Sequence, residues 1–198
     1  ICTMDCGEYN NIHPVDKRTP GERLGNCALH QVYGMSRIPV YGPTVLGFRC
    51  DEGGRVRLFF RYAHGLHFSG TTPDSFGDEL AKSLPSLVRL PEHSGFELAG
   101  ADGVFHPAYA AIFVDCDIDD LVNARVNVVD YNATEFGIPI NSRSIGTITL
   151  ATPKVPQPVM MRYAWRNWGP APLFNDNNLP AHPFKLDLTD HTDSDHVE

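Results

Sequence analysis

Residues 45–62, VLGFRCDEGGRVRLFFRY, decide the fold class of this chain. Residues 45–50 and 56–62 are two short strand-like runs rich in aliphatic and aromatic side chains. They are joined by DEGG at residues 51–54, and a Gly-Gly pair between two such runs is a strong turn signal. The stretch therefore predicts a β-hairpin.

Similar runs continue along the chain. A second candidate hairpin has its turn at residues 100–103, GADG. Further strand-like runs lie at residues 96–99, 104–106, 110–114, 125–131, 147–151 and 159–165. Seven or eight short strands separated by turn signals, with 16 prolines spread among them, are typical of a β-sandwich. Residues 74–84 are compatible with a helical turn.

The segment before the hairpin predicts one helix, from about residue 20 to 33. Thr19 is a suitable N-cap, Pro20 suits the first helical position, and Glu22 completes a capping box. Gly34 supplies a left-handed C-cap. Apolar residues recur at helical spacing, namely Leu24, Ala28 and Val32. A helix this short is not stable alone, so we expect it to dock on another element.

Composition limits the function classes. The 198 residues suffice for one large domain, or for one domain and a fragment of another. The net charge of −8 is a poor match for nucleic acid, whose binding depends on phosphate neutralisation. No apolar run approaches the ~20 residues that span a bilayer, so we expect no membrane span.

A first residue of Ile1, without methionine or leader, suggests a processed product or an excised portion. The acidic tail at residues 189–198, which includes His191 and His196, is expected to be disordered.

The cysteines and one sequon favour the secretory route. Five cysteines leave at least one that is free or paired with another chain. Cys2 and Cys6 lack a downstream ligand pair at zinc-finger spacing, which argues against zinc. Asn132 begins the N-glycosylation sequon Asn-Ala-Thr.

His13 is the leading candidate for chemistry. It precedes Pro14 in a polar loop directly ahead of the capped helix, and loops held by rigid elements often carry catalytic groups. Asp5, Glu8 and Asp16 are close enough in sequence for one of them to orient the imidazole, as a general base requires. The alternative, which the residues alone favour, is that His13 caps a turn.

Other polar clusters are weaker candidates. His64 and His67 have helical metal-binding spacing, but they follow a strand, flank Gly65 and lack a third ligand. The aspartates between residues 115 and 120 lack the glycine and the terminal glutamate of a calcium loop. Neither a phosphate-cradling glycine loop nor a Gly-x-Ser-x-Gly elbow is present.

Three sets of motifs occur in order along the chain. The first set is NIHPVDK at residues 11–17, GERL at 21–24 and VYG at 32–34. The second is GFELAGADG at 95–103, and the third is RYAW at 162–165 with LPAHPF at 179–184. They resemble the "(D/N)IHPxDK…GxRL…YG", "GFEIAGADG" and "RYAW…LPAxPF" signatures of sialate O-acetylesterases, which are SGNH/GDSL-type hydrolases. The resemblance spans residues 5–187 and corresponds to the C-terminal part of the family's length.

The resemblance implies a site divided between two segments. His13 would be the general base of a serine esterase that hydrolyses O-acetyl esters of sugars, above all of sialic acids. The serine and the oxyanion donors would lie in an N-terminal part, or large subunit, without counterpart here, so this chain alone would be inactive. Cys2 or Cys6 would be placed for an interchain disulfide with that part. Such enzymes are secreted or lysosomal and need no metal or organic cofactor.

One position departs from the related hydrolases. Many SGNH hydrolases have aspartate three residues before the histidine, where this chain has Asn10. Asparagine can orient an imidazole but cannot offset its positive charge. Either a Ser-His dyad operates, or an acid such as Asp5 or Asp16 approaches, or activity has been lost. Arg162, Tyr163 and Trp165 have two interpretations. Either they contact substrate, or they belong to a strand of the sandwich that carries a buried aromatic side chain.

These observations predict a mainly β chain. Residues 1–37 would form the C-terminal loop and helix of an SGNH α/β/α hydrolase domain, followed by a β-sandwich-like accessory domain at 38–188. The expected function is carbohydrate O-acetyl ester hydrolysis. The alternatives are an esterase acting on acetylxylan or another glycan, and a non-catalytic carbohydrate-binding or structural relative.

Overall fold

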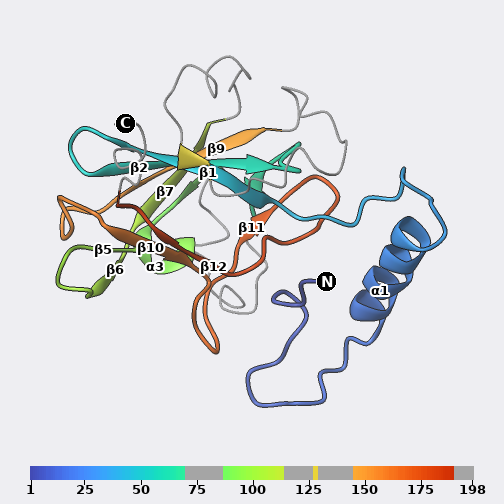
Figure 1. Cartoon of the computed structure of the whole chain (residues 1–198). Helices are drawn as coiled ribbons and strands as arrows, with labels where there is room; N and C mark the ends of the chain where they lie inside the picture. The colour runs from blue at the N-terminus through green and yellow to red at the C-terminus, as the bar shows by residue number, and fades with distance from the viewer. Residues whose placement is uncertain (70–86, 114–126, 129–144, 190–198) are drawn as a thin grey trace, which may run out of the picture.

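The computed structural model describes residues 1–69, 87–113, 127–128 and 145–189 (Figure 1). The predicted helical turn at 74–84, the acidic cluster at 115–120 and the sequon at Asn132 lie outside the described residues, as does the tail beyond residue 189.

Two antiparallel sheets form most of the molecule. The six-stranded sheet has the order β4 (Val88–Arg89), β7 (Tyr109–Phe113), β9 (Gly146–Ala151), β2 (Arg55–Arg61), β1 (Thr44–Asp51) and β8 (Asn127–Val128). The four-stranded sheet has the order β12 (Phe184–Asp187), β10 (Met160–Tyr163), β5 (Phe96–Ala99) and β6 (Phe105–Pro107). A short ladder joins β11 (Leu173–Phe174) to β3 (His67–Phe68), and a one-turn helix, α3 (Pro91–Ser94), precedes β5.

The predicted β1–β2 hairpin is confirmed. Its residue pairs run from Thr44 opposite Arg61 at the open end to Asp51 opposite Arg55 at the turn. Its turn needs glycine for two reasons. Gly53 and Gly54 both have positive φ angles, of 76° and 75°, which L-residues with side chains rarely adopt. A Cβ atom on Gly54 would also lie 2.4 Å from the carbonyl oxygen of Pro156, so the turn packs against that segment.

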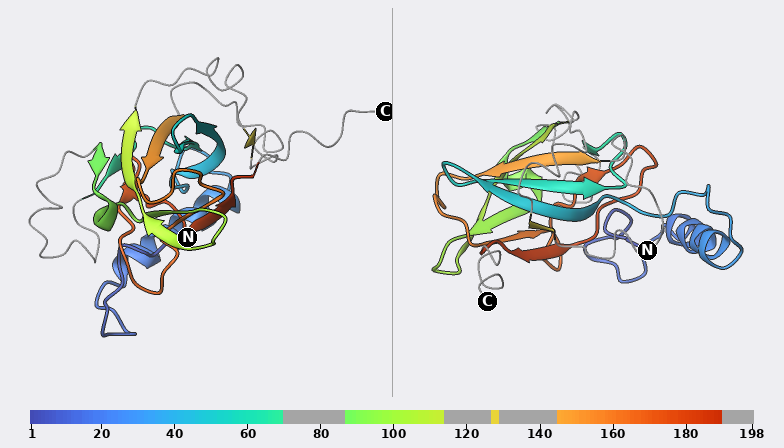
Figure 2. Two further views of the ribbon diagram at one scale, coloured as in Figure 1. Left: turned by 90° about the vertical axis from the view of Figure 1, so that its left-hand side faces the viewer. Right: turned by 45° about the horizontal axis from the view of Figure 1, so that its top comes forward.

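The two sheets enclose one hydrophobic core. On β2 the alternate residues Val56, Leu58 and Phe60 are buried, as strand periodicity requires when one face is covered. Phe60 meets Phe184 of the four-stranded sheet edge to face, with ring centroids 6.0 Å apart. The core cluster contains side chains of both sheets, and Figure 2 shows the sheets face to face. The predicted mainly β fold is therefore confirmed, and its core is that of a sandwich.

The helix exists but begins earlier than predicted. Helix α1 (Arg18–Gln31) starts two residues before Pro20, and Thr19 lies inside its first turn. The carboxylate of Asp16 accepts a hydrogen bond from the backbone N–H of Thr19 at 3.0 Å, so Asp16 satisfies a donor of the first turn. Thr19 as N-cap was therefore wrong. The predicted C-cap was also wrong, because the helix ends at Gln31 and its C-cap is Val32, in a right-handed conformation; Gly34 has the expected left-handed φ of 70° but lies two residues further on.

Helix α1 does not bury its apolar residues within this chain. None of its 14 residues is buried, and Leu24 on α1 and Val32 at its end are exposed. Figures 1 and 2 show the helix beside the sandwich, beyond the ends of its strands. Polar contacts join it to the following segment, including one between the ring of His30 and the Ile38 carbonyl at 2.8 Å. The expected docking of its apolar stripe is absent from the described part of the chain.

Candidate functional site

His13 lies on the loop that leads into α1, and its side chain is exposed. The neighbouring side chains of Ile12 and Val15 are also exposed, Ile12 to 91%. Within the described residues, no hydrogen bond to the His13 ring is found. An exposed imidazole beside exposed apolar side chains is accessible to a group brought to it from outside these residues.

Glu8 and Asn11 hold the His13 loop in shape. The Glu8 carboxylate accepts hydrogen bonds from the Val15 backbone N–H at 2.7 Å and from the Asn11 amide at 2.8 Å. The Asn11 side-chain oxygen in turn accepts the backbone N–H of His13 at 2.9 Å. These bonds lower the pKa of Glu8, that from Val15 contributing most. No periodic pattern in the sequence indicates this scaffold, because side-chain bonds to loop backbone follow no repeat.

The residues predicted to orient His13 have other contacts. Asp5 forms a two-point ion pair with Arg23, with both N–O distances 2.7 Å. Asp16 accepts hydrogen bonds from Thr19, and these bonds lower the pKa of Asp16. The bond from the Thr19 side chain contributes most. Asn10 is exposed on the loop. Neither carboxylate contacts the ring of His13, so the acid partner remains a prediction.

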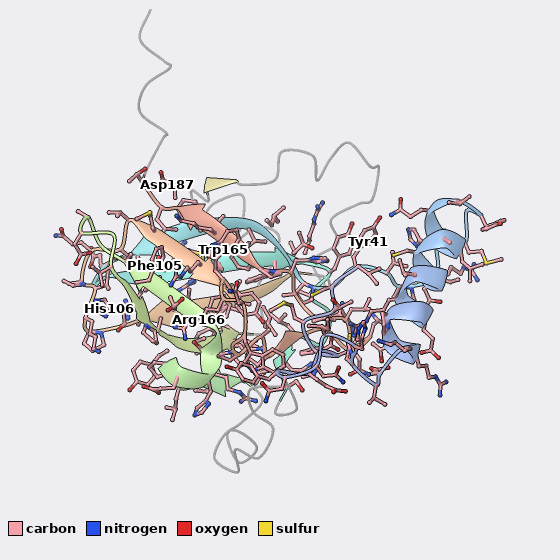
Figure 3. All side chains as sticks on the ribbon, turned by 90° about the horizontal axis from the view of Figure 1, so that it is seen from below. Tyr41, Phe105, His106, Trp165, Arg166 and Asp187 are labelled. Atoms are coloured by element: carbon pink, nitrogen blue, oxygen red, sulfur yellow. The ribbon has the colours of Figure 1, made fainter. Side chains whose placement is uncertain are left out.

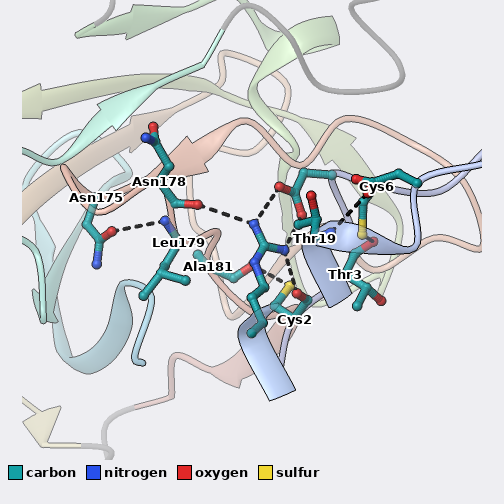
Figure 4. Close-up of polar contacts among 11 residues, drawn as sticks. Cys2, Thr3, Cys6, Thr19, Asn175, Asn178, Leu179 and Ala181 are labelled. Atoms are coloured by element: carbon teal, nitrogen blue, oxygen red, sulfur yellow. Dashed lines mark hydrogen bonds and ion pairs between the residues drawn. The ribbon is translucent and has the colours of Figure 1, made fainter. Parts of the chain in front are cut away.

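Arg23 joins three segments of the chain (Figure 4). Besides Asp5, its guanidinium donates to the carbonyl oxygens of Cys2 at 2.7 Å and Asn178 at 3.2 Å. It therefore links α1 to the N-terminal segment and to the loop after β11. Tyr9 adds a second link, because its ring meets Trp168 edge to face with centroids 5.5 Å apart. Arg23 belongs to the GERL motif, which was the only signal of its importance in the sequence.

A cavity of about 400 Å³ lies between α1 and the sandwich. Its lining includes Asp5, Arg23 and Asn178, together with His67 from β3, but not His13. The candidate base is therefore not directed into this cavity.

The two N-terminal cysteines differ in accessibility. Cys2 is buried, and its thiol contacts the carbonyl oxygen of Ala181 at 3.6 Å. Burial raises its thiol pKa. Cys6 is partly exposed, and its thiol lies 3.4 Å from the Thr3 carbonyl. Neither forms a disulfide within the described residues, and Cys6 is the more accessible to a partner.

The histidines of the His64/His67 pair have separate contacts. Nδ1 of His64 lies 2.5 Å from the carboxylate of Asp176, and that of His67 lies 2.9 Å from the Gly65 carbonyl. Across the described residues, no three His, Cys, Asp or Glu side chains gather as metal ligands. Nor does any helix of this part of the chain have the length and hydropathy to cross a membrane.

The RYAW segment divides between core and surface. Tyr163 is completely buried, and its hydroxyl accepts the backbone N–H of Leu173 at 2.9 Å. Burial raises its pKa far above the ordinary value. Arg162 binds Glu97, whereas Trp165 is exposed. The buried-aromatic interpretation therefore holds for Tyr163 but not for Trp165.

Comparison with known proteins gives one informative likeness. No protein-family model and no curated protein matches the chain. Among solved structures, the chain is similar to a carbohydrate acetylesterase from Xanthomonas citri, with a TM-score of 0.59 and 26% sequence identity. The match covers 92% of this chain but 31% of that protein, so this chain spans less than a third of its length. The likeness supports a relationship to the carbohydrate esterases.

Proposed function

We propose that this chain is part of a serine-type carbohydrate O-acetylesterase that acts on O-acetylated sialic acids. The observation that carries the proposal is the match of 92% of the chain to a carbohydrate acetylesterase. The IHP, GERL, RYAW and LPAHPF motifs supply the narrower assignment to sialate esters.

In this proposal His13 is the general base. A serine outside these residues attacks the acetyl carbonyl, and its hydroxyl proton passes to the imidazole. The tetrahedral intermediate collapses to acetyl-serine as the bond to the sugar oxygen breaks, and His13 donates the proton to that oxygen, which leaves as a hydroxyl. Water then attacks the acetyl group while His13 takes its proton, and acetate leaves as the proton returns to the serine. Asn10, Asp5 and Asp16 remain the candidates for orienting the ring.

The exposed loop and helix support a second segment that completes the site. Ile12, Val15 and Leu24 are exposed around His13 and α1, and burying such side chains against another surface is favourable by about 1.5–3 kcal/mol each. We propose that an N-terminal part or large subunit covers them and carries the serine. Cys6 is better placed than Cys2 for a disulfide to it. A secreted or lysosomal location suits these features and the Asn132 sequon.

The test compares His13→Ala with His64→Ala in the complete protein containing this chain. His64 is an exposed histidine whose ring pairs with Asp176, so its loss controls for removal of an imidazole. Acetate release from O-acetylated sialoside should fall by on the order of a thousandfold in His13→Ala and little in His64→Ala. Undiminished turnover in His13→Ala would refute the assignment.

The same assay separates the alternatives. Faster release from acetylated xylo-oligosaccharide than from the sialoside would favour an acetylxylan-type esterase with the same base. No release from any acetylated glycan by the complete wild-type protein would favour a non-catalytic relative, which the substitution of Asn10 for aspartate makes a real alternative.

A further inference from the structure

The outer face of the four-stranded sheet carries a cleft that the esterase proposal does not use. Its volume is about 160 Å³, and it lies between α3, β5 and the segment that follows β10. Its lining includes Glu92, Phe96, Trp165 and Arg166. Figure 3 views the molecule from the side of this sheet, with Trp165 and Arg166 labelled.

The backbone directs Trp165 out of the core. Strand alternation beyond β10 would place Trp165 on the same side as the buried Tyr163. Ala164 breaks the alternation with a φ of 47°, a conformation that costs a non-glycine residue on the order of 1 kcal/mol and persists only where surrounding contacts fix it. Its N–H donates to the Gly95 carbonyl at 2.9 Å. The indole is consequently 51% exposed at the cleft.

The close packing of Gly95 keeps this wall of the cleft in place. A Cβ atom there would lie 2.5 Å from the Pro170 carbonyl oxygen, and Gly95 itself has φ 74°. The segments on the two sides of Trp165 are thus fixed by backbone contacts rather than by long side chains.

Charged side chains of both signs line the cleft. The side chain of Glu97 is 7% exposed, and its carboxylate accepts a hydrogen bond from Nε of Arg162 at 2.7 Å and another from Arg166. Burial alone would raise the pKa of Glu97, but its bonds to the two guanidiniums hold it below the ordinary value. Arg162 is further held over the ring of Phe105, 4.0 Å from its centroid. Arg162 is not itself part of the lining, whose charged residues are Glu92, Glu97 and Arg166.

Arg166 retains hydrogen-bonding capacity. A guanidinium has five N–H donors, and the Glu97 bond uses one nitrogen. The side chain is 49% exposed, so its other donors are available at the cleft mouth. Glu92, which also lines the cleft, provides acceptors.

We propose that this cleft is a non-catalytic binding site for a neutral pyranose unit of a glycan. One face of a pyranose presents C–H groups that pack on an exposed indole, while its edge presents hydroxyls that both donate and accept. Trp165 supplies the apolar surface, Arg166 the donors and Glu92 the acceptors. Because the carboxylates of Glu92 and Glu97 outnumber the guanidinium of Arg166 among the lining residues, the cleft offers no net attraction for a carboxylated sugar. The site would hold glycan on the sandwich independently of His13.

The test is a fluorescence titration of the chain with neutral oligosaccharides of xylose, glucose, galactose, mannose and N-acetylglucosamine. The chain has two tryptophans, so Trp168→Phe leaves Trp165 as the only indole reporter. We expect a saturable change in this variant with at least one neutral oligosaccharide. Calorimetry with Trp165→Ala should show affinity lower by on the order of tenfold or more, whereas Trp165→Phe should retain part of it.

The outcomes are decisive in both directions. A signal that no neutral oligosaccharide saturates would overturn the proposal, as would unchanged affinity in Trp165→Ala. Tighter binding of sialyllactose than of every neutral oligosaccharide would overturn the neutral-sugar assignment. Unfolding curves of Trp165→Ala should match the wild type, because the side chain is half exposed. The esterase proposal has a separate test, and it fails if the His13→Ala variant still releases acetate at the wild-type rate.

Discussion

Replacing Arg23 with methionine should loosen the N-terminal segment and α1 while leaving the sandwich folded. Methionine keeps the length and most of the apolar stem of arginine but removes the donors that contact Asp5, Cys2 and Asn178. The side chain of Arg23 is only 10% exposed and that of Asp5 only 17%. The substitution therefore leaves a largely buried carboxylate without its partner.

The magnitude follows from that burial. Removing one member of a buried ion pair typically costs about 3–5 kcal/mol, since the remaining charge stays desolvated. At the lower end, the equilibrium for opening of the segment increases by on the order of a hundredfold. The pair formed by Arg18 and Glu22 on the same helix is the matched control, with side chains 87% and 60% exposed. Its loss in Arg18→Met should have little effect on the segment, because both charges stay solvated.

Amide hydrogen exchange measured by mass spectrometry tests this difference. In Arg23→Met, peptides from residues 1–31 should exchange on the order of a hundredfold faster, while those of β2 should keep wild-type protection. Arg18→Met should resemble the wild type throughout. Equal exchange in the two variants would refute the reasoning, because it would mean that burial of the Arg23 pair contributes nothing to holding the segment.

Two further predictions concern the His13 loop and the hairpin turn. The lowered pKa of Glu8 means that its bonds to the loop are fully present above pH 4.5 and are lost as pH falls through the depressed value. The Val15 amide shift should report one such transition by NMR, absent in Glu8→Gln; a transition only above pH 4.5 would contradict this. In denaturant unfolding, Gly53→Ala should cost about 1–2 kcal/mol for its positive φ alone. Gly54→Ala should cost more, because its Cβ would also meet Pro156, and equal costs would show that this contact is unimportant.

The fold could be predicted from the sequence wherever the determining interactions are local. The DEGG turn and its flanking runs are contiguous, so the hairpin follows from residues 45–62 alone. The helix start was missed because Asp16, a residue outside the expected capping box, supplies the acceptor for the first turn. Strand order could not be predicted, since β9 pairs with β2 from a distant part of the chain and no local signal specifies that partner.

The candidate site, like the fold, could be predicted from the sequence only in part. His13 was found through its motif, whereas the bonds from Glu8 and Asn11 that shape its loop depend on coordinates and follow no spacing rule. The predicted strand ran on to Trp165, whereas β10 ends at Tyr163, because Ala164 adopts a left-handed conformation that changes the side on which the next side chain lies. That conformation depends on Gly95, which is distant in sequence and adjacent in space.

The strand order of the larger sheet also has a kinetic consequence. Its central strand β2 pairs on one side with β1 across a three-residue turn, and on the other with β9, which begins only at Gly146. Closing so long a loop costs entropy before the new contacts repay it, and sheets dominated by such pairings fold on a timescale of about milliseconds to seconds. We expect the hairpin to form first and to wait for β9, with one edge of β2 unpaired during that interval. Newly made chains are then open to pairing with one another, so refolding yield should fall as protein concentration rises.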